Sequence, residues 1–429
     1  MSVGMNDSGI EWIGEIPDNW NLMPVKAILM ERNETNNPIQ TDFILSLTVD
    51  KGVIPYNEKT GGGNKAKEDL TAYKLTYPKD IVLNSMNILA GSVGISKYFG
   101  CVSPVYYTLY VRDDSYSIDY FNNIFQTKEF QANLRGLGNG IMIKESGTGK
   151  LNTIRMRISM SKLNRVMLPV PPKHIQEHIA NVLDKKCTEI DETIESTRLS
   201  IEEYKKYKKS IITETVYKGL KNEVELKESE INYIGTIPKH WKVKKIKNVL
   251  TPLNRPVLQT DDVITCFRDG EVTLRKNRRT DGYTFSDTEK GYQGVEIGDL
   301  VIHGMDAFAG AIGISDSRGK CTPVVHVCES KENKRYYMYL LRSFALNDVF
   351  MALSEGVRIR SSDFRNWDKL AKIMVVSPPL SEQKEIADYL DSKCIEIDNL
   401  IVQKQKVISE LETYKKSLIY EIVTGKKEV

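Results

Sequence analysis

PPKHIQEHIANVLDKKCTEID, residues 171–191, decides the fold of this chain because it occurs twice. The second copy is PPLSEQKEIADYLDSKCIEID, residues 378–398. The copies align without a gap at an offset of 207 residues (378 − 171 = 207), and the match continues through YKKS at 207–210 and 414–417. A repeat of this length indicates two related structural units.

Each copy predicts one long helix. Pro-Pro ends the element before it, since proline cannot continue a hydrogen-bond ladder, and the next glycines are Gly219 and Gly425. Apolar residues recur at alternating spacings of three and four, which is typical of a coiled coil. The predicted interface residues are Leu183, Ile190, Ile194, Ile201, Tyr204 and Ile211 in the first helix and Leu390, Ile397, Ile401, Ile408, Leu411 and Leu418 in the second.

We expect these two seams to pack against each other. The helices should run antiparallel, because only residues 220–232 connect the first helix to the next repeat and cannot return along its whole length. Two unrelated helices of a bundle are the alternative. Lys208 is the weak point of the first seam, since its charge has to reach out of the interface to water.

A second repeat opens each half of the chain. WIGEIPDNW at 12–20 matches YIGTIPKHW at 233–241, at an offset of 221 (233 − 12 = 221). The chain is therefore a tandem duplication of a globular α+β region followed by a long helix, and we expect pseudo-two-fold symmetry across the helix pair. The predicted domains are the first globular region at 1–170, the first helix at 171–220, the second globular region at 221–375 with 221–232 as a linker, and the second helix at 376–429.

A third match lies inside the globular regions. DIVLNSM at 80–86 corresponds to DLVIHGM at 299–305, at an offset of 219 (299 − 80 = 219). The pattern predicts a strand-turn-strand core in which Gly91, Gly94, Gly310 and Gly313 supply positive φ angles. A phosphate-cradling loop is the alternative, although no helix start is evident after these glycines.

Composition excludes several classes of protein. Of 429 residues 41% are hydrophobic, no apolar run approaches the roughly 20 residues needed to span a bilayer, and the N-terminus has no secretory apolar core, so we expect a cytoplasmic protein. The six cysteines form no Cys-x-x-Cys pair and are interpreted as reduced, buried thiols. The net charge is only +3, yet basic residues cluster in loops, where they suit a phosphate backbone.

These loops differ between the two halves, as expected of related modules with different ligands. Arginine can bind guanine, and asparagine adenine, through two hydrogen bonds each, although for any single residue an ordinary surface charge is the alternative. The candidate DNA-binding residues are Lys65, Lys67, Asn139, Lys144, Lys150, Arg275, Lys276, Arg278, Arg279, Arg358 and Arg360.

Catalytic motifs are absent from the sequence. GTGK at 147–150 lacks the spacing and the following hydroxyl of a nucleotide-binding P-loop. His174 and His178 are four residues apart, but Glu177 is the only acidic residue near them, so we expect no metal site. There is also no amino-methyltransferase motif and no nuclease carboxylate cluster. The chain is predicted to read a ligand and not to catalyse a reaction.

The repeated plan, the two openings WIGEIP and YIGTIP, and the helix start PPLSEQKEIA resemble the specificity subunits of type I restriction-modification systems. RDGEVTLRKNRRTDG at 268–282 is also similar to a stretch common in such subunits, and the resemblance covers nearly the whole chain. The first helix start departs from the pattern, since KHIQE at 173–177 replaces the more usual LSEQK. This departure would affect a partner contact and not the fold.

The resemblance implies that each globular region is a target-recognition domain that reads one half of a bipartite, asymmetric sequence in double-stranded DNA. It also implies docking of two methyltransferase subunits and, in the restriction complex, two restriction subunits. S-adenosylmethionine, ATP and magnesium would belong to those partners, so no cofactor is expected in this chain. The alternatives are a coiled-coil scaffold joining two protein-binding modules and, less compatible with the missing acidic cluster, an independent DNA-cutting enzyme.

Overall fold

The computed structural model describes residues 4–60, 66–138, 157–221, 223–278, 290–353 and 364–429. The chain forms two compact units. Unit 1 comprises residues 1–197 and 406–429, and unit 2 comprises residues 198–405. Each unit contains one globular region and one part of each long helix, α5 (Lys173–Lys218) and α9 (Leu380–Val423). The predicted domains instead kept each helix separate.

The globular region of unit 1 is built on a four-stranded antiparallel sheet. The strand order is β4 (Leu29–Glu31), β11 (Tyr106–Val111), β8 (Ile81–Asn84) and β9 (Val93–Ile95). Four two-stranded antiparallel pairs surround it: β1 (Met5–Asp7) with β2 (Glu15–Pro17), β3 (Asn21–Pro24) with β12 (Met167–Val170), β5 (Leu45–Thr48) with β6 (Gly52–Pro55), and β7 (Lys74–Thr76) with β10 (Gly100–Val102). The short helices are α1 (Val25–Ile28), η1 (Tyr56–Glu58), η2 (Ile88–Ala90), α2 (Ile118–Gln126), α3 (Lys128–Asn133), η3 (Leu134–Leu137) and α4 (Met160–Leu163).

Unit 2 repeats this plan strand for strand. Its four-stranded antiparallel sheet has the order β16 (Thr251–Pro252), β23 (Val325–Glu329), β20 (Leu300–His303) and β21 (Ile312–Ile314). The four pairs are β13 (Leu226–Glu228) with β14 (Thr236–Pro238), β15 (Lys242–Lys245) with β24 (Met374–Ser377), β17 (Ile264–Cys266) with β18 (Val272–Leu274), and β19 (Gln293–Val295) with β22 (Gly319–Cys321). The helices are η4 (Ile246–Asn248), η5 (Arg275–Asn277), η6 (Ala307–Ala309), α6 (Lys334–Leu346), α7 (Val349–Leu353) and α8 (Trp367–Ala371). The predicted duplication is confirmed.

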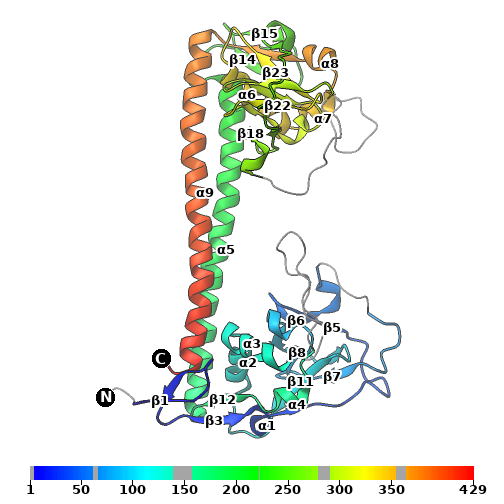
Figure 1. The fold of residues 1–429 in the computed structure, drawn as a ribbon, viewed down its shortest axis with the longest axis vertical. Helices are drawn as coiled ribbons and strands as arrows, with labels where there is room; N and C mark the ends of the chain where they lie inside the picture. Colours follow the sequence, from blue (N-terminus) through cyan, green and yellow to red (C-terminus); the bar gives the residue numbers. More distant parts are fainter. Residues whose placement is uncertain (1–3, 61–65, 139–156, 222, 279–289, 354–363) are drawn as a thin grey trace. The chain divides into compact units, whose positions relative to one another are not determined.

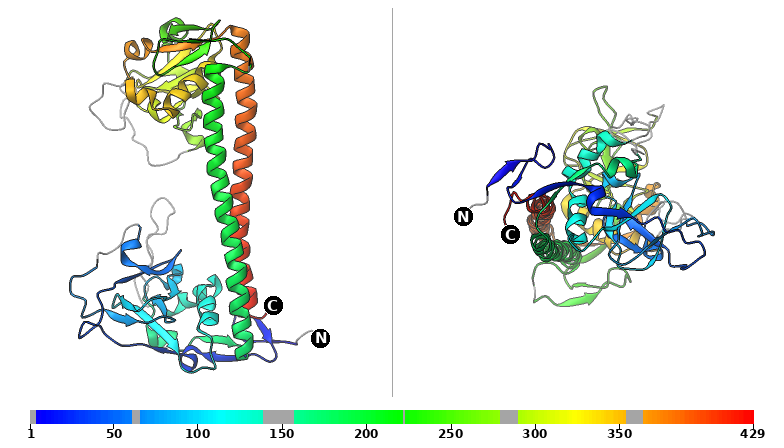
Figure 2. Two further views of the ribbon diagram at one scale, coloured as in Figure 1. Left: turned by 180° about the vertical axis from the view of Figure 1, so that it is seen from behind. Right: turned by 90° about the horizontal axis from the view of Figure 1, so that it is seen from below.

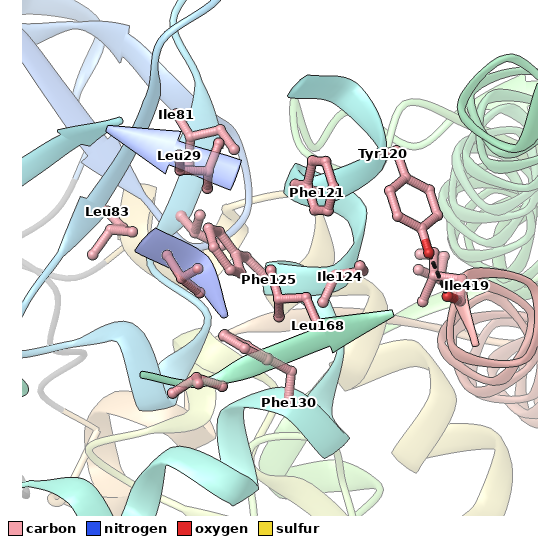
Figure 3. Close-up of a cluster of buried hydrophobic side chains, with 14 of the residues drawn as sticks. Leu29, Ile81, Leu83, Tyr120, Phe121, Ile124, Phe125, Phe130, Leu168 and Ile419 are labelled. Atoms are coloured by element: carbon pink, nitrogen blue, oxygen red, sulfur yellow. Dashed lines mark hydrogen bonds between the residues drawn. The ribbon is translucent and has the colours of Figure 1, made fainter. Parts of the chain in front are cut away.

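Helix α2 fills the core of unit 1. Its residues Tyr120, Phe121, Ile124 and Phe125 recur with helical spacing and are fully buried. Figure 3 shows the ring of Phe121 beside Leu29 and Ile81 of the sheet, whereas Tyr120 points away from them toward α9. Burying side chains of this size contributes about 1.5–3 kcal/mol each, so α2 joins the sheet to the long helices.

The long helices lie side by side and antiparallel in each unit (Figures 1 and 2). In unit 1 an ion pair joins Asp191 to Lys415, and in unit 2 an ion pair joins Lys208 to Asp398. The later residue of α5 therefore pairs with the earlier residue of α9, as in an antiparallel pair. All twelve predicted interface residues are buried or half-buried: Leu183, Ile190, Ile194, Ile201, Tyr204, Ile211, Leu390, Ile397, Ile401, Ile408, Leu411 and Leu418. The predicted antiparallel pair is confirmed within each unit.

A buried tyrosine attaches the end of one long helix to each globular region. The hydroxyl of Tyr120 lies 2.9 Å from the carbonyl oxygen of Val423 and 3.1 Å from that of Pro169. In unit 2 the hydroxyl of Tyr336 lies 3.0 Å from the carbonyl oxygen of Val216 and 3.5 Å from that of Val376. The carbonyl partners are related by the helix offset of 207 residues (423 − 216 and 376 − 169), so this joint is also duplicated.

The glycine prediction holds for one glycine of each pair. Gly91 and Gly310 have φ angles of 84° and 91°. Gly94 and Gly313 instead lie in strands β9 and β21, where a side chain would strike the backbone of the neighbouring hairpin. At Gly313, an added Cβ would lie 1.9 Å from the carbonyl oxygen of Gly270. These two glycines therefore serve close strand packing and not turn formation.

All six cysteines are free, and five of them are buried while Cys187 is half-buried. Burial raises the pKa of Cys101 to about 11 and that of Cys321 to about 12, so these thiols stay protonated near neutral pH. Within the described residues, no helix is long and apolar enough to cross a membrane.

Candidate nucleic-acid interface

The best described part of the candidate DNA-binding surface is the β17–β18 hairpin with η5, which follows it directly. Arg275 begins η5, and its backbone N–H donates to the carbonyl of Val263 at 2.8 Å. Its Nε also donates to the hydroxyl of Thr265, at 3.2 Å. These two bonds fold the basic segment back onto the hairpin that carries it.

Lys276 lies on the exposed side of η5. Its Nζ is 2.5 Å from Oδ2 of Asp262, and more than half of each side chain is exposed. Water screens a pair with this exposure, which is typically worth about 0.2–1 kcal/mol. Lys276 can therefore exchange its carboxylate for a phosphate at small cost.

Arg278 is held on two sides. Its Nη1 is 2.7 Å from carboxylate oxygens of both Asp269 and Glu271. Its guanidinium carbon also lies 4.2 Å from the ring centroid of Phe267. The hydrogen bond that Arg278 donates to Asp269, with the negative charges of Asp269 and Glu271, raises the pKa of Arg278. The side chain is thus a fixed cation, still 36% exposed.

The sequence reasoning missed the residues that hold this cation. Arg268 was also not a candidate, yet it is 65% exposed and lies 2.9 Å from Asp306. Its guanidinium is 5.9 Å from the ring centroid of Phe308. The available signal was the pair of acidic residues Asp269 and Glu271 shortly before the basic segment 275–278, since opposite charges can meet across a hairpin.

Unit 1 carries a different surface at the equivalent place. The segment η1 follows β6 as η5 follows β18, at an offset of 219 (275 − 56 = 219), and starts with Tyr56 where η5 starts with Arg275. The Tyr56 hydroxyl accepts a hydrogen bond from the backbone of Ala66 at 2.9 Å. The exposed Lys67 follows, and its N–H donates to the Tyr73 hydroxyl at 3.2 Å. One scaffold therefore presents aromatic and amide groups in unit 1 and arginines in unit 2.

The structure thus brings Arg275, Lys276 and Arg278 together on one hairpin and places Lys67 in the other unit. The remaining candidates lie outside the described residues: Lys65, Asn139, Lys144, Lys150, Arg279, Arg358 and Arg360. The described residues contain no group of three or more histidine, cysteine, aspartate or glutamate side chains that could hold a metal ion. The hairpin can therefore supply cationic hydrogen-bond donors, which suit phosphates and base edges.

The chain is similar in sequence to two curated specificity subunits. The chain is 23% identical over 441 aligned positions to the putative type I restriction enzyme MjaX specificity subunit of Methanocaldococcus jannaschii, with 97% of this chain and 96% of that protein covered. It is 26% identical to the MjaVIII specificity subunit of the same organism over 62% of this chain and 63% of that protein. No family model matches the chain.

Solved structures share the fold. The crystal structure of the HsdS subunit from Thermoanaerobacter tengcongensis superimposes with a TM-score of 0.56 at 10% identity, covering 96% of this chain and 98% of that one. A chain from a structural study of complex assembly and conformational transition in the type I restriction-modification system gives a TM-score of 0.68 at 10% identity, covering 96% and 99%.

The chain is thus similar in sequence to type I restriction enzyme specificity subunits and shares the fold of the solved HsdS structure. Within this chain one scaffold occurs twice, with different polar residues after the same hairpin.

Proposed function

We propose that this chain reads a bipartite, asymmetric sequence in double-stranded DNA, with each globular region contacting one half. The observation that carries the proposal is the pair of equivalent hairpins, β5–β6 and β17–β18, which end in different chemistry. An identical scaffold orients both reading surfaces in the same way, and the different side chains select different bases. A protein with two such modules binds an asymmetric target.

The partners in this proposal are two methyltransferase subunits, joined by two restriction subunits in the complete complex. The methyltransferase subunits would supply S-adenosylmethionine and modify adenine, while the restriction subunits would use ATP and magnesium. This chain contributes DNA reading and docking and holds none of these cofactors. The duplicated joints at Tyr120 and Tyr336 favour two equivalent partners, since they attach a long helix to each globular region in the same way.

The test is methylation mapping with the full chain co-expressed with its methyltransferase subunits. Replacing Arg268, Lys276 and Arg278 together with alanine should change or relax one half of the target only. Each arginine that reads a base should be worth about 1–3 kcal/mol of discrimination. Lys67→Ala is the matched change in unit 1 and should act on the other half-site.

Two outcomes would contradict the proposal. If the unit 2 variant altered both half-sites, the reading surfaces would not be independent modules. If the chain bound neither DNA nor methyltransferase subunits at low salt, the scaffold alternative would be favoured, because phosphate contacts should be strongest under that condition.

A further inference from the structure

An open groove of about 680 Å³ lies in unit 2 between the last turns of α5 and the hairpin formed by β13 and β14. It opens to solvent. We call it the α5 groove. Its walls include Lys206, Lys209, Thr213 and Tyr217 of α5, Gly235 of the hairpin and Asn347 beyond α6. All of these residues belong to unit 2.

The equivalent place in unit 1 is filled by the chain itself. Tyr420 stands where α5 has Thr213 (420 − 213 = 207), and its hydroxyl donates to the carbonyl of Trp12 at 3.0 Å. The Nζ of Lys426 lies 4.4 Å from the Tyr420 ring centroid. Thus a large side chain and a lysine from the C-terminal segment occupy this position in unit 1.

The space beside Gly14 and Gly235, the equivalent glycines of the two hairpins, shows this difference between the units. A Cβ added to Gly14 would lie 3.3 Å from Nζ of Lys426. At Gly235, which corresponds to Gly14 at the offset of 221, no atom lies within 4 Å of such a Cβ. The duplicated scaffold therefore has room for an additional segment in unit 2, because Thr213 is smaller than its counterpart.

Charge on the rim indicates what could enter. Lys206 and Lys209 are exposed, and the described residues include no ion-pair partner for either of them. Lys218 lies 3.7 Å from Glu214, the only acidic residue among those that line the described groove. Beside these lysines, Nδ2 of the exposed Asn347 donates to the hydroxyl of Thr213 at 3.1 Å. The groove thus has an excess of positive charge beside exposed polar groups.

We propose that the α5 groove binds an acidic peptide segment of a partner protein. A peptide fits the shape, since the same place in unit 1 already holds a residue of a chain end. A DNA duplex could touch the rim lysines with its phosphates, whereas a peptide corresponds to the C-terminal segment that occupies the equivalent place in unit 1. Carboxylates of the segment would pair with Lys206 and Lys209, and its backbone would face Thr213 and Asn347. This inference does not depend on DNA reading by the chain.

The test uses the full chain and a fluorescein-labelled hexaglutamate peptide, with binding followed by fluorescence anisotropy at low salt. The double variant Lys206→Glu, Lys209→Glu should weaken binding about tenfold or more, because it replaces attraction with repulsion at the rim. Thr213→Tyr should weaken it similarly without changing charge, since it introduces the side chain that fills unit 1. Lys416→Glu is the matched control, because Lys416 is the exposed counterpart of Lys209 (416 − 209 = 207).

We expect both groove variants to lose affinity for the peptide, and the control Lys416→Glu to bind it with wild-type affinity. Equal affinity of all variants, or an equal loss with Lys416→Glu, would overturn the proposal. So would a DNA duplex whose affinity falls with the rim variant while peptide affinity does not, since the groove would then be a phosphate contact. Circular dichroism of each variant establishes that the helices remain folded. Methylation of the bipartite target, measured separately, distinguishes failure of this proposal from failure of the proposed function.

Discussion

Lys415 of α9 bonds both carboxylate oxygens of Asp191 in α5, at 2.7 and 2.6 Å. The same bond joins Lys208 to Asp398 at the same distances in unit 2. Both lysines stand at seam positions of the coiled coil, and both are about one quarter exposed. A polar pair at a seam can specify how two helices are aligned, because any other alignment leaves a charge without its partner.

Exchanging the charges of one pair tests this role. Lys415→Asp should destabilise unit 1, since two carboxylates would then face each other, and adding Asp191→Lys should recover most of the loss. The coupling energy should be about 0.5–1 kcal/mol, the upper part of the range for exposed pairs. Urea unfolding of the two single variants and the double variant measures it. Exchange of Lys205 and Glu202, which pair within α5, is the control and should leave the alignment of the helices unaffected. The prediction would be contradicted if the changes in unfolding free energy of the two single variants, Lys415→Asp and Asp191→Lys, simply added up in the double variant.

The loss of unfolding free energy on truncating a seam residue to alanine should depend on how deeply that residue is buried. Leu390 is fully buried and Leu411 is half-buried, so Leu390→Ala should cost about 3–5 kcal/mol and Leu411→Ala about 2 kcal/mol of unfolding free energy. Val402, which is 62% exposed on the same helix, provides the control, and Val402→Ala should cost under about 0.5 kcal/mol. A loss under about 0.5 kcal/mol at Leu390 would argue against a packed seam.

The close strand contacts predict an asymmetry between the units. Gly313→Ala places a methyl group 1.9 Å from a backbone oxygen, whereas Gly94→Ala places it 2.9 Å from the Cα of Gly52. We expect Gly313→Ala to cost about 3 kcal/mol or more and Gly94→Ala about 1–2 kcal/mol. Gly136 has no atom within 4 Å of an added Cβ, so Gly136→Ala is the control. Thermal unfolding gives the order, and equal effects at Gly94 and Gly313 would show that the hairpin of unit 2 can move away.

Two buried histidines should make unit 2 sensitive to acid. Burial lowers the pKa of His326, whose Nε2 donates to the carbonyl of Phe364 at 2.7 Å, and burial also lowers the pKa of His303. As the pH falls below about 6.5, the unfolded chain binds protons before the folded chain, so stability present above that pH is lost. In unit 1 the place of His326 is taken by Tyr107, whose hydroxyl donates to the carbonyl of Ile158 at 3.1 Å.

Hydrogen exchange at about pH 7.5 and about pH 5.5 checks this expectation. After correction for the intrinsic exchange rate, lowering the pH should reduce the protection of backbone amides in β20 and β23 more than that of amides in β8 and β11. His326→Gln keeps a side-chain donor and should reduce the difference. Equal loss of protection in both sheets would mean that other groups control the acid response.

The sequence was sufficient for features that depend on repetition and periodicity. The gapless copies predicted two helices and their interface residues, and matched segments such as 80–86 and 299–305 predicted equivalent strands. It was not sufficient where a contact joins distant residues. Gly313 was assigned to a turn because its neighbour in space, Gly270, is 43 positions away (313 − 270 = 43). The ion pairs of Arg278 with Asp269 and Glu271 could not be predicted, because they depend on how the hairpin folds.

The duplication also predicts that a fragment of residues 1–225 forms a dimer. In such a dimer α5 of the second copy would replace α9, so Lys208 of one copy would meet Asp191 of the other at both ends of the pair. The seam lysine, expected from sequence alone to weaken this interface, would then keep an ion pair. Val216 would also stand in for Val423 and offer its carbonyl to Tyr120. An isolated amphipathic helix of this length would otherwise expose its apolar seam to water.

The fragment should be a weaker pair than the intact chain, for a reason that the structure identifies. The replacement removes large side chains near the end of α9, since Tyr420 becomes Thr213 and the fully buried Ile422 becomes Thr215. Thr215→Ile in the fragment should therefore tighten the dimer by about 1–2 kcal/mol, because it restores a buried apolar side chain; an exposed change such as Leu199→Ala should not. Sedimentation of both variants measures the dissociation constants.

A two-fold dimer presents one reading surface to both half-sites, so methylation mapping with methyltransferase subunits should give an interrupted palindrome. A monomeric fragment, or a dimer that still selects the asymmetric target, would show that the two units are not interchangeable across the helix pair.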